Sequence, residues 1–192
     1  MRSKEPATTK ERLLSEARDV FLEMGEAAFS LREVARRSGV TAAAVYRHFD
    51  GKEALLAAVC AEGFRVFGSY LMQALGEKKP FERLRATGAK YLEFALERPQ
   101  DYRVIFMRDV HAGPLVSPDS SFQFLVDRVR ECIAAKALRD DVPEALAVTI
   151  WSHVHGLASL RLAGHLEPVG DEKAFRAFFL ASTDDLLAGL AP

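Results

Sequence analysis

Residues 29–53 read FSLREVARRSGVTAAAVYRHFDGKE, and this stretch decides the fold of the chain. Ser30 precedes Glu33 by three residues, the spacing at which a hydroxyl and a carboxylate cap the first turn of a helix. Gly39 comes where that helix must end, because glycine readily adopts the left-handed conformation that follows many helices. Thr41 is a suitable N-cap for a second helix. The pattern therefore predicts two short helices joined by a tight turn.

The second of these helices is expected to present an exposed face with few side chains. Val45 and Phe49 lie four residues apart, so we expect both to face inward with Val34. The first turn of the opposite face then carries almost no side chains, which lets its backbone approach another surface closely. The residues expected on this exposed face are Ala43, Ala44, Arg47 and His48.

A third helix is predicted directly after this motif. Asp50 is its expected cap, with Glu53 three residues later. Lys52 projects from the first turn, where a cation opposes the helix dipole, so its position suggests a nearby anion such as a phosphate. Residues 32–52 hold five Arg or Lys against two Asp or Glu, whereas the whole chain has a net charge of −1. This local excess favours a nucleic-acid partner.

The run V-A-x-x-S-G-V-T-x-A-x-V-Y-x-H-F-x-x-K-E-x-L resembles the motif of the TetR-type transcriptional regulators. The continuation Y-x-H-F-x-x-K-E makes this resemblance specific. It implies that the second motif helix enters the DNA major groove and that Tyr46, His48 and Lys52 touch the backbone or base edges. In such complexes phosphate contacts set the register, whereas base-edge contacts set the sequence.

The chain departs from the family pattern at three consecutive alanines, residues 42–44, where glycine and polar residues are common. Arg32 and Arg47 then remain as the candidates for reading a guanine, and the alanines could still contact thymine methyl groups. The expected DNA-binding residues are Ser30, Arg32, Thr41, Ala42, Ala43, Ala44, Tyr46, Arg47, His48 and Lys52.

Three other interpretations of the sequence have less support. The basic residues could be an ordinary solvated face of a three-helix corner. The chain could also be a helical adaptor of the same fold that lacks DNA binding, although Tyr46, His48 and Lys52 speak against this. An enzyme is the third alternative, but His153 and His155 face different sides of a helix, and no catalytic or metal-binding motif is present. We expect no catalysis, no metal and no cofactor.

The composition predicts a soluble, cytoplasmic chain without a membrane partner. The 192 residues are 49% hydrophobic, but they contain no run of about 18 apolar residues and no signal peptide pattern. Cys60 and Cys132 lie far apart on predicted apolar helix faces, so we expect free thiols.

The rest of the chain also has helical periodicity and no strand pattern of useful length. We expect an all-α fold of about nine helices, in which a helix-turn-helix DNA-binding domain (1–51) is joined to a helical effector-binding and dimerisation domain (52–192). The expected helices outside the motif are 8–24, which Gly25 ends, then 52–76, 80–98, 99–110, 119–138, 143–163 and 171–188.

A W-x-x-x-H-G pattern, formed by Trp151, His155 and Gly156, resembles the C-terminal domain of one TetR subgroup. Trp151 and His155 are four residues apart and share a helix face, so they could line a ligand cavity or belong to an ordinary core. The residues expected around a small-molecule effector are Tyr91, Phe94, Tyr102, Phe106, Met107, Trp151 and His155.

The helix that carries this pattern is apolar on several sides and also rich in small residues. Such a helix needs more than one packing partner. The family resemblance implies homodimers in which the last two helices of each protomer form a four-helix bundle. The function implied is a DNA-binding regulator, a repressor that a small molecule releases from its operator.

Overall fold

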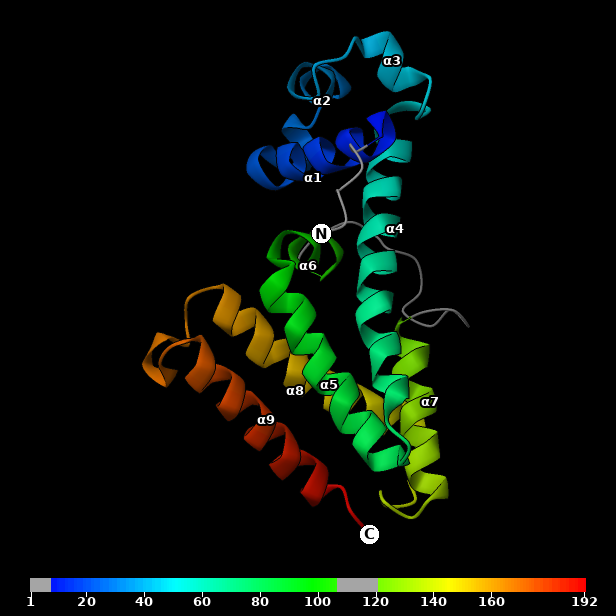
Figure 1. The fold of residues 1–192 in the computed structure, drawn as a ribbon, viewed down its shortest axis with the longest axis vertical. Helices are drawn as coiled ribbons and strands as arrows, with labels where there is room; N and C mark the ends of the chain where they lie inside the picture. The colour runs from blue at the N-terminus through cyan, green and yellow to red at the C-terminus, as the bar shows by residue number, and fades with distance from the viewer. Residues whose placement is uncertain (1–7, 107–120) are drawn as a thin grey trace, which may run out of the picture. The chain divides into compact units, whose positions relative to one another are not determined.

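The computed structural model of the chain describes residues 8–106 and 121–192. This part of the chain is helical and contains no β-strand, as expected (Figure 1). Within these described ranges the chain forms nine α-helices and two short 3₁₀ helices, Gln73–Gly76 and Glu167–Val169. The α-helices are α1 (Thr9–Ala28), α2 (Leu31–Arg37), α3 (Ala42–Tyr46), α4 (Gly51–Met72), α5 (Pro80–Glu97), α6 (Pro99–Phe106), α7 (Ser121–Ala134), α8 (Pro143–Leu162) and α9 (Glu172–Gly189).

Helix α1 begins and breaks where its sequence requires. The Thr8 hydroxyl accepts a hydrogen bond from the Glu11 amide, and the Glu11 carboxylate accepts one from the Thr8 amide. Gly25 has a φ of +71°, so the regular helix ends there and one further turn follows. Apolar side chains spaced along one face are buried, namely Leu13, Ala17, Val20 and Phe21.

The described residues divide into two compact units. Residues 8–65 and 100–106 form the first unit, and residues 66–99 and 121–192 form the second. The boundary falls inside α4, which contributes residues to both units. The domain division expected after residue 51 remains a prediction.

Helix α6 follows α5 in the chain but packs in the first unit, against α1 and α4. Arg18 Nη1 of α1 donates a hydrogen bond of 2.9 Å to the buried Asp101 carboxylate. Gly63 of α4 approaches α6 so closely that a Cβ atom there would lie 2.6 Å from the side chain of Ile105. Glycine at position 63 therefore permits the close contact of α4 with α6.

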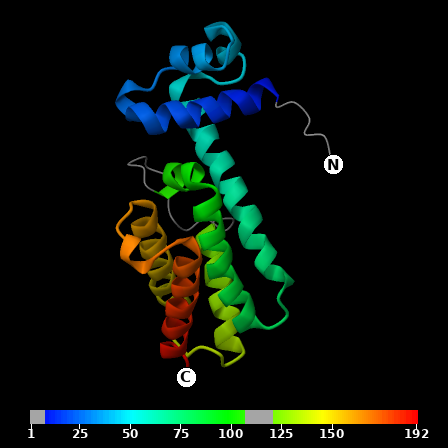
Figure 2. The ribbon, with the colours of Figure 1, turned by 60° about the vertical axis from the view of Figure 1, so that its left-hand side comes forward.

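The second unit is built around α5, which contacts α7, α8 and α9. In Figures 1 and 2, α8 and α9 lie side by side. Asp171 caps α9 by accepting a hydrogen bond from the Ala174 amide, and Pro80 and Pro143 occupy the first turns of α5 and α8 as expected. One apolar core holds Leu84, Val126, Val129, Leu146, Ile150 and Leu187.

Helix α7 is shorter than expected. The helix predicted to continue to residue 138 ends at Ala134, because Lys136 turns the backbone with a φ of +55°. The amides of Lys136 and Ala137 then bond back to the carbonyls of Ile133 and Cys132. Leu138 is buried in the core although it lies beyond the helix, so its apolar side chain suggested a longer helix. The predicted residues 119 and 120 lie outside the described part.

The segment Gly51–Gly76 is long and apolar enough to cross a membrane by length and composition alone, with a mean hydropathy of 1.4. Glu62 and Arg65 interrupt its apolar sequence and pair with each other at 2.7 Å. The core helix of a soluble protein passes the same test, so this segment is weak evidence for a membrane helix.

Candidate DNA-binding surface

Helices α2 and α3 and the start of α4 build the motif predicted from residues 29–53. In α2, the Ser30 hydroxyl accepts a hydrogen bond from the Glu33 amide, and in α3 the Thr41 hydroxyl accepts one from the Ala44 amide. Gly39 makes the turn between them with a φ of +66°. Figures 1 and 2 show α3 beside α2, which packs on α1. The predicted helix-turn-helix geometry is thus present.

Helix α3 (Ala42–Tyr46) and the residues that flank it expose most of the side chains assigned to DNA contact. Tyr46 is 60% exposed, and Thr41, Ala43, Arg47 and His48 are also exposed. Ala42 is partly buried. A short helix with such small residues in its first turn lets a bound duplex approach its backbone.

The expected exposure of Ala44 is wrong. Its side chain is buried, with only 7% of its surface exposed, beside the fully buried Val45. The buried stripe of a helix is about 100° wide or more, so it includes the neighbour of Val45. A thymine contact by Ala44 therefore has no structural support, whereas Ala43 keeps its exposed position.

Two of the basic residues on α2 are bound within the protein. Arg36 donates two hydrogen bonds to the Glu33 carboxylate, and Arg37 donates one to Glu33 and pairs with Glu23 at 2.7 Å. The hydrogen bonds from Arg36 and then Arg37 lower the pKa of Glu33 from 4.5 to about 2. These four side chains have no net charge together, so the local excess of positive charge is smaller than the sequence count suggests.

Arg32 and Arg47 differ from this pair. Both side chains are exposed, and neither donates a hydrogen bond within the described residues. A guanidinium presents donors in a planar fork that fits the acceptor edge of guanine. These two arginines therefore keep the donors that base readout requires.

Lys52 has a partner that the sequence did not predict. Its ammonium donates a hydrogen bond of 2.5 Å to the backbone carbonyl of Glu26, near the end of α1. The carboxyl end of a helix attracts a cation, which explains why this lysine is tolerated in the first turn of α4. Lys52 thus ties the start of α4 to the end of α1, and its contact with phosphate remains a prediction.

The residues expected around an effector lie in both compact units. Tyr91, Phe94, Trp151 and His155 belong to the second unit, whereas Tyr102 and Phe106 belong to the first. The rings of Tyr102 and Phe106 lie 5.1 Å apart, and Phe106 also contacts Phe64. Met107 lies outside the described residues.

Within the second unit, Tyr91, Trp151 and His155 form a connected group. The hydroxyl of Tyr91 and Nδ1 of His155 are joined by a hydrogen bond of 2.8 Å, and the Trp151 ring lies 5.5 Å from the His155 ring. Burial lowers the pKa of His155, which favours the neutral form of its ring. Phe94 is fully buried and Tyr91 nearly so, whereas Trp151 is partly exposed and packs against Phe122. Core packing thus accounts for Phe94 but leaves part of Trp151 accessible.

Helices α8 and α9 carry exposed apolar side chains in addition to their buried ones. On α8, Val148 and Leu160 are more than 40% exposed although Leu146 and Ile150 of the same helix are buried. On α9, Phe178 and Leu180 are also more than 40% exposed. Both helices therefore have apolar surface that the described chain does not cover.

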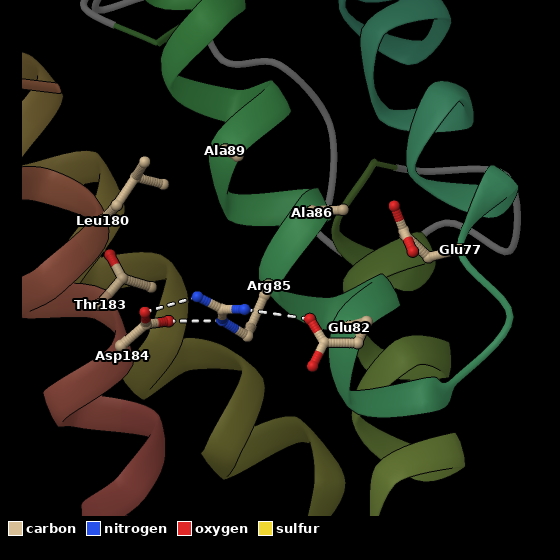
Figure 3. A pocket seen from close by; sticks show the side chains of 8 residues that line it. All are labelled: Glu77, Glu82, Arg85, Ala86, Ala89, Leu180, Thr183 and Asp184. Atoms are coloured by element: carbon tan, nitrogen blue, oxygen red, sulfur yellow. Dashed lines mark hydrogen bonds and ion pairs between the residues drawn. The ribbon is translucent and has the colours of Figure 1, made fainter. Parts of the chain in front are cut away.

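A shallow pocket of about 240 Å³, which the sequence did not predict, lies between α5 and α9 (Figure 3). Arg85 lies in it and donates two hydrogen bonds of 2.6 Å to Asp184 and one of 3.0 Å to Glu82. These bonds raise the pKa of Arg85 and lower that of Asp184. A pairing of residues 99 positions apart has no sequence signal, and it ties α5 to α9.

Neither a metal centre nor a disulfide is seen among residues 8–106 and 121–192. No group of three or more His, Cys, Asp or Glu side chains is arranged there to hold a metal ion. Cys132 is buried and Cys60 partly buried, and neither forms a disulfide within these ranges.

The sequence is similar to known protein families and to known regulators. Residues 13–59 match the family described as "Bacterial regulatory proteins, tetR family", and residues 84–186, more than half of the chain, match "Tetracyclin repressor-like, C-terminal domain". The transcriptional activator FasR of Mycolicibacterium smegmatis is 34% identical over 106 residues, which are 55% of this chain and 48% of that protein. The regulator SrpR of Pseudomonas putida is 42% identical over 57 residues, 30% of this chain and 27% of that protein. The chain thus spans about half or less of the length of these curated relatives.

Solved structures are similar over nearly the whole chain. A protein of unknown function from Rhodococcus sp. RHA1 has a TM-score of 0.79 and 26% identity, with both chains covered in full. The TetR family regulator PfmR from Thermus thermophilus has a TM-score of 0.72 and 21% identity, covering 94% of this chain and all of that one. The family matches agree with the all-α fold and the helix-turn-helix. The matched families are regulators, which supports the expectation that the chain is not an enzyme. The chain therefore belongs to the TetR family of bacterial transcriptional regulators.

Proposed function

We propose that the protein binds operator DNA through α3 and regulates transcription of nearby genes in the cytoplasm. The observation that carries this proposal is the exposed face of α3, next to which Arg32 and Arg47 keep their donors available. Tyr46 and His48 lie exposed beside them, and the segment that holds all four matches the TetR family. A helix of this kind reads base edges while its neighbours contact the DNA backbone.

The protein acts as a homodimer through α8 and α9. The exposed apolar side chains of Val148, Leu160, Phe178 and Leu180 support this, because a second copy would remove them from water. A dimer places two α3 helices in successive major grooves, about 34 Å apart. The operator is then an inverted repeat with half-sites about one helical turn apart or a multiple of it.

The protein is a repressor, and a small apolar molecule releases it from DNA. The group formed by Tyr91, Trp151 and His155 supports an effector site, because it combines aromatic surface with polar atoms that can orient a ligand. The ligand shifts the population of dimers toward a geometry that no longer fits successive grooves. FasR is named an activator, so a transcription assay with and without the protein decides the sign of regulation.

The test is to select DNA fragments with the full chain from a random library and to footprint the enriched sequences. We expect an inverted repeat whose half-sites are protected on one face of the duplex. Arg47→Ala should relax selection at one base pair in each half-site. Failure to enrich any sequence would favour the alternative, a helical adaptor of the same fold that lacks DNA binding.

A further inference from the structure

Helix α2 carries a positive charge that is exposed but already compensated. The Arg36 side chain is 70% exposed, yet its Nε and Nη2 atoms donate hydrogen bonds of 2.8 and 2.6 Å to the two carboxylate oxygens of Glu33. Two parallel hydrogen bonds of this kind fix the guanidinium in a definite orientation. Arg36 is thus accessible to solvent while its donors point toward Glu33.

The same carboxylate also holds Arg37. Arg37 Nε donates a hydrogen bond of 2.8 Å to Glu33, and its Nη1 atom lies 2.7 Å from Glu23 of α1. The Arg37 side chain is only 24% exposed, so it serves to join α2 to α1. If Glu33 is removed, both arginines lose their hydrogen bonds to it, but Arg37 keeps Glu23 as a partner whereas Arg36 has no other partner within the described residues.

In the proposed mode of DNA binding, Arg36 belongs to the helix that crosses the DNA backbone. The first helix of a helix-turn-helix crosses the phosphate backbone while the second enters the groove. Arg32 and Arg36 are four residues apart, are both exposed and therefore share one face of α2. Of these two neighbours, Arg32 has no hydrogen-bonding partner among the described residues, whereas Arg36 is paired.

We propose that Glu33 withholds Arg36 from the DNA phosphates and thereby limits the electrostatic part of the DNA affinity. This inference rests on the proposed function. Phosphate contacts add affinity for every sequence alike, so Glu33 lowers binding to operator and unrelated DNA by the same factor. Glu33 thus lowers the affinity for DNA without changing the preferred sequence. The lower affinity keeps the operator complex weak enough to be released.

Replacement of Glu33 by glutamine exposes the effect. Glu33→Gln removes the negative charge that pairs with Arg36 and replaces one of the two acceptor oxygens by an amide NH₂ group, so it breaks the two-bond contact. The change leaves Arg37 paired with Glu23 and keeps a residue suited to the first turn of α2. One additional phosphate contact makes the slope of log K against log salt steeper by about 0.9. Affinity then falls roughly 3.5-fold more than for the parent between 50 and 200 mM salt, for operator and unrelated DNA alike.

The matched control is Glu16→Gln, which removes one negative charge from α1 at a residue that forms no ion pair within the described part of the chain. Arg36→Gln in the parent should leave the salt slope almost unchanged, because Arg36 is withheld there. The same change in the Glu33→Gln background should remove the gain completely. Thermal melting of each variant shows that the chain is folded.

The outcomes separate this inference from the proposed function. A parent that binds no DNA overturns both. A parent that binds DNA with selectivity, together with equal slopes for Glu33→Gln and Glu16→Gln, overturns the role of Glu33 alone. A slope lowered by about 0.9 for Arg36→Gln in the parent background overturns it as well, even if Glu33→Gln fails to fold.

Discussion

The surface of α3 and the aromatic group near His155 differ in how their polar atoms are satisfied. Arg32 and Arg47 in the first unit donate no hydrogen bonds within the described chain. In the second unit, Tyr91 bonds to His155. A surface with free donors indicates what kind of partner it binds, whereas a group whose polar atoms bond to one another can serve packing or a ligand. The difference explains why the sequence identifies the DNA partner more sharply than the effector.

Two aromatic truncations in the second unit should differ most in how far they lower the free energy of unfolding. Phe94→Ala removes a fully buried ring and should lower the free energy of unfolding by about 3–5 kcal/mol. Trp151→Ala removes a partly exposed ring and should lower it by about 2 kcal/mol while DNA binding is retained. Denaturant titration measures both values.

The role of Trp151 then follows from the response to ligands. If Trp151 lines an effector site, the folded Trp151→Ala variant binds operator but no longer dissociates when active ligands are added. Equal destabilisation by the two truncations, with DNA binding lost in both, would instead assign Trp151 to the core.

The guanidinium groups of Arg32 and Arg47 in the first unit should determine which bases the protein prefers. One of Arg32 and Arg47 should read a guanine, and we replace each by alanine. The substitution of the arginine that reads this guanine should weaken binding by about 1–3 kcal/mol at that base pair and relax the base preference there. Arg65→Ala is a suitable control, because Arg65 is exposed but paired with Glu62 on α4. Competition with operators substituted at single positions measures the effect. Unchanged base preferences in both variants would show that the protein recognises the operator through DNA shape and not through these arginines.

The two serines of the motif should respond in opposite directions to the same substitution. The Ser38 hydroxyl is buried without a hydrogen-bond partner in the described part of the chain, so Ser38→Ala should raise stability by about 1 kcal/mol. Ser30 caps α2, so Ser30→Ala should lower stability by about 1 kcal/mol. Denaturant midpoints compare them. A clear loss of stability in Ser38→Ala would show that its hydroxyl has a partner after all.

The two units should also differ in the pH range over which they lose stability. Burial lowers the pKa of His155 below its usual 6.5, so the stability from its neutral ring is present above pH 6.5 and lost as the pH falls. Pairing with Arg36 and Arg37 lowers the pKa of Glu33 from 4.5 to about 2, so its contribution is present above pH 4.5 and lost toward pH 2.

Substitutions separate these two ranges. His155→Gln should flatten the decline of melting temperature that begins as the pH falls below about 6.5, and Glu33→Gln should flatten it between about pH 4.5 and 2. His165→Gln, which removes an exposed histidine, is the control. If the melting temperature of a variant declines as it does in the parent, the substituted residue does not cause the pH dependence in that range.

Local features were predictable from the sequence because the interactions that make them lie within one turn of chain. The caps predicted at Ser30 and Thr41 each involve a residue three positions away, and both are present. Gly39 similarly marked the turn of the motif. Spacing alone is enough to identify such contacts.

Contacts between distant segments were not predictable in this way. The burial of Ala44, the bond from Lys52 to Glu26, and the ion pair of Arg85 with Asp184 depend on how helices pack. The placement of α6 in the first unit likewise depends on Arg18 and on the missing side chain at Gly63. Sequence spacing carries no information about such pairs.

The central claim is that α3 reads DNA sequence, and the ratio of two dissociation constants tests it most directly. The constants are those of the full chain for its selected operator and for a scrambled duplex of equal length, measured at the same physiological salt concentration. A specific regulator should bind the operator at least about 10³-fold more tightly. Equal affinities for the two duplexes, or no binding to either, would contradict the claim.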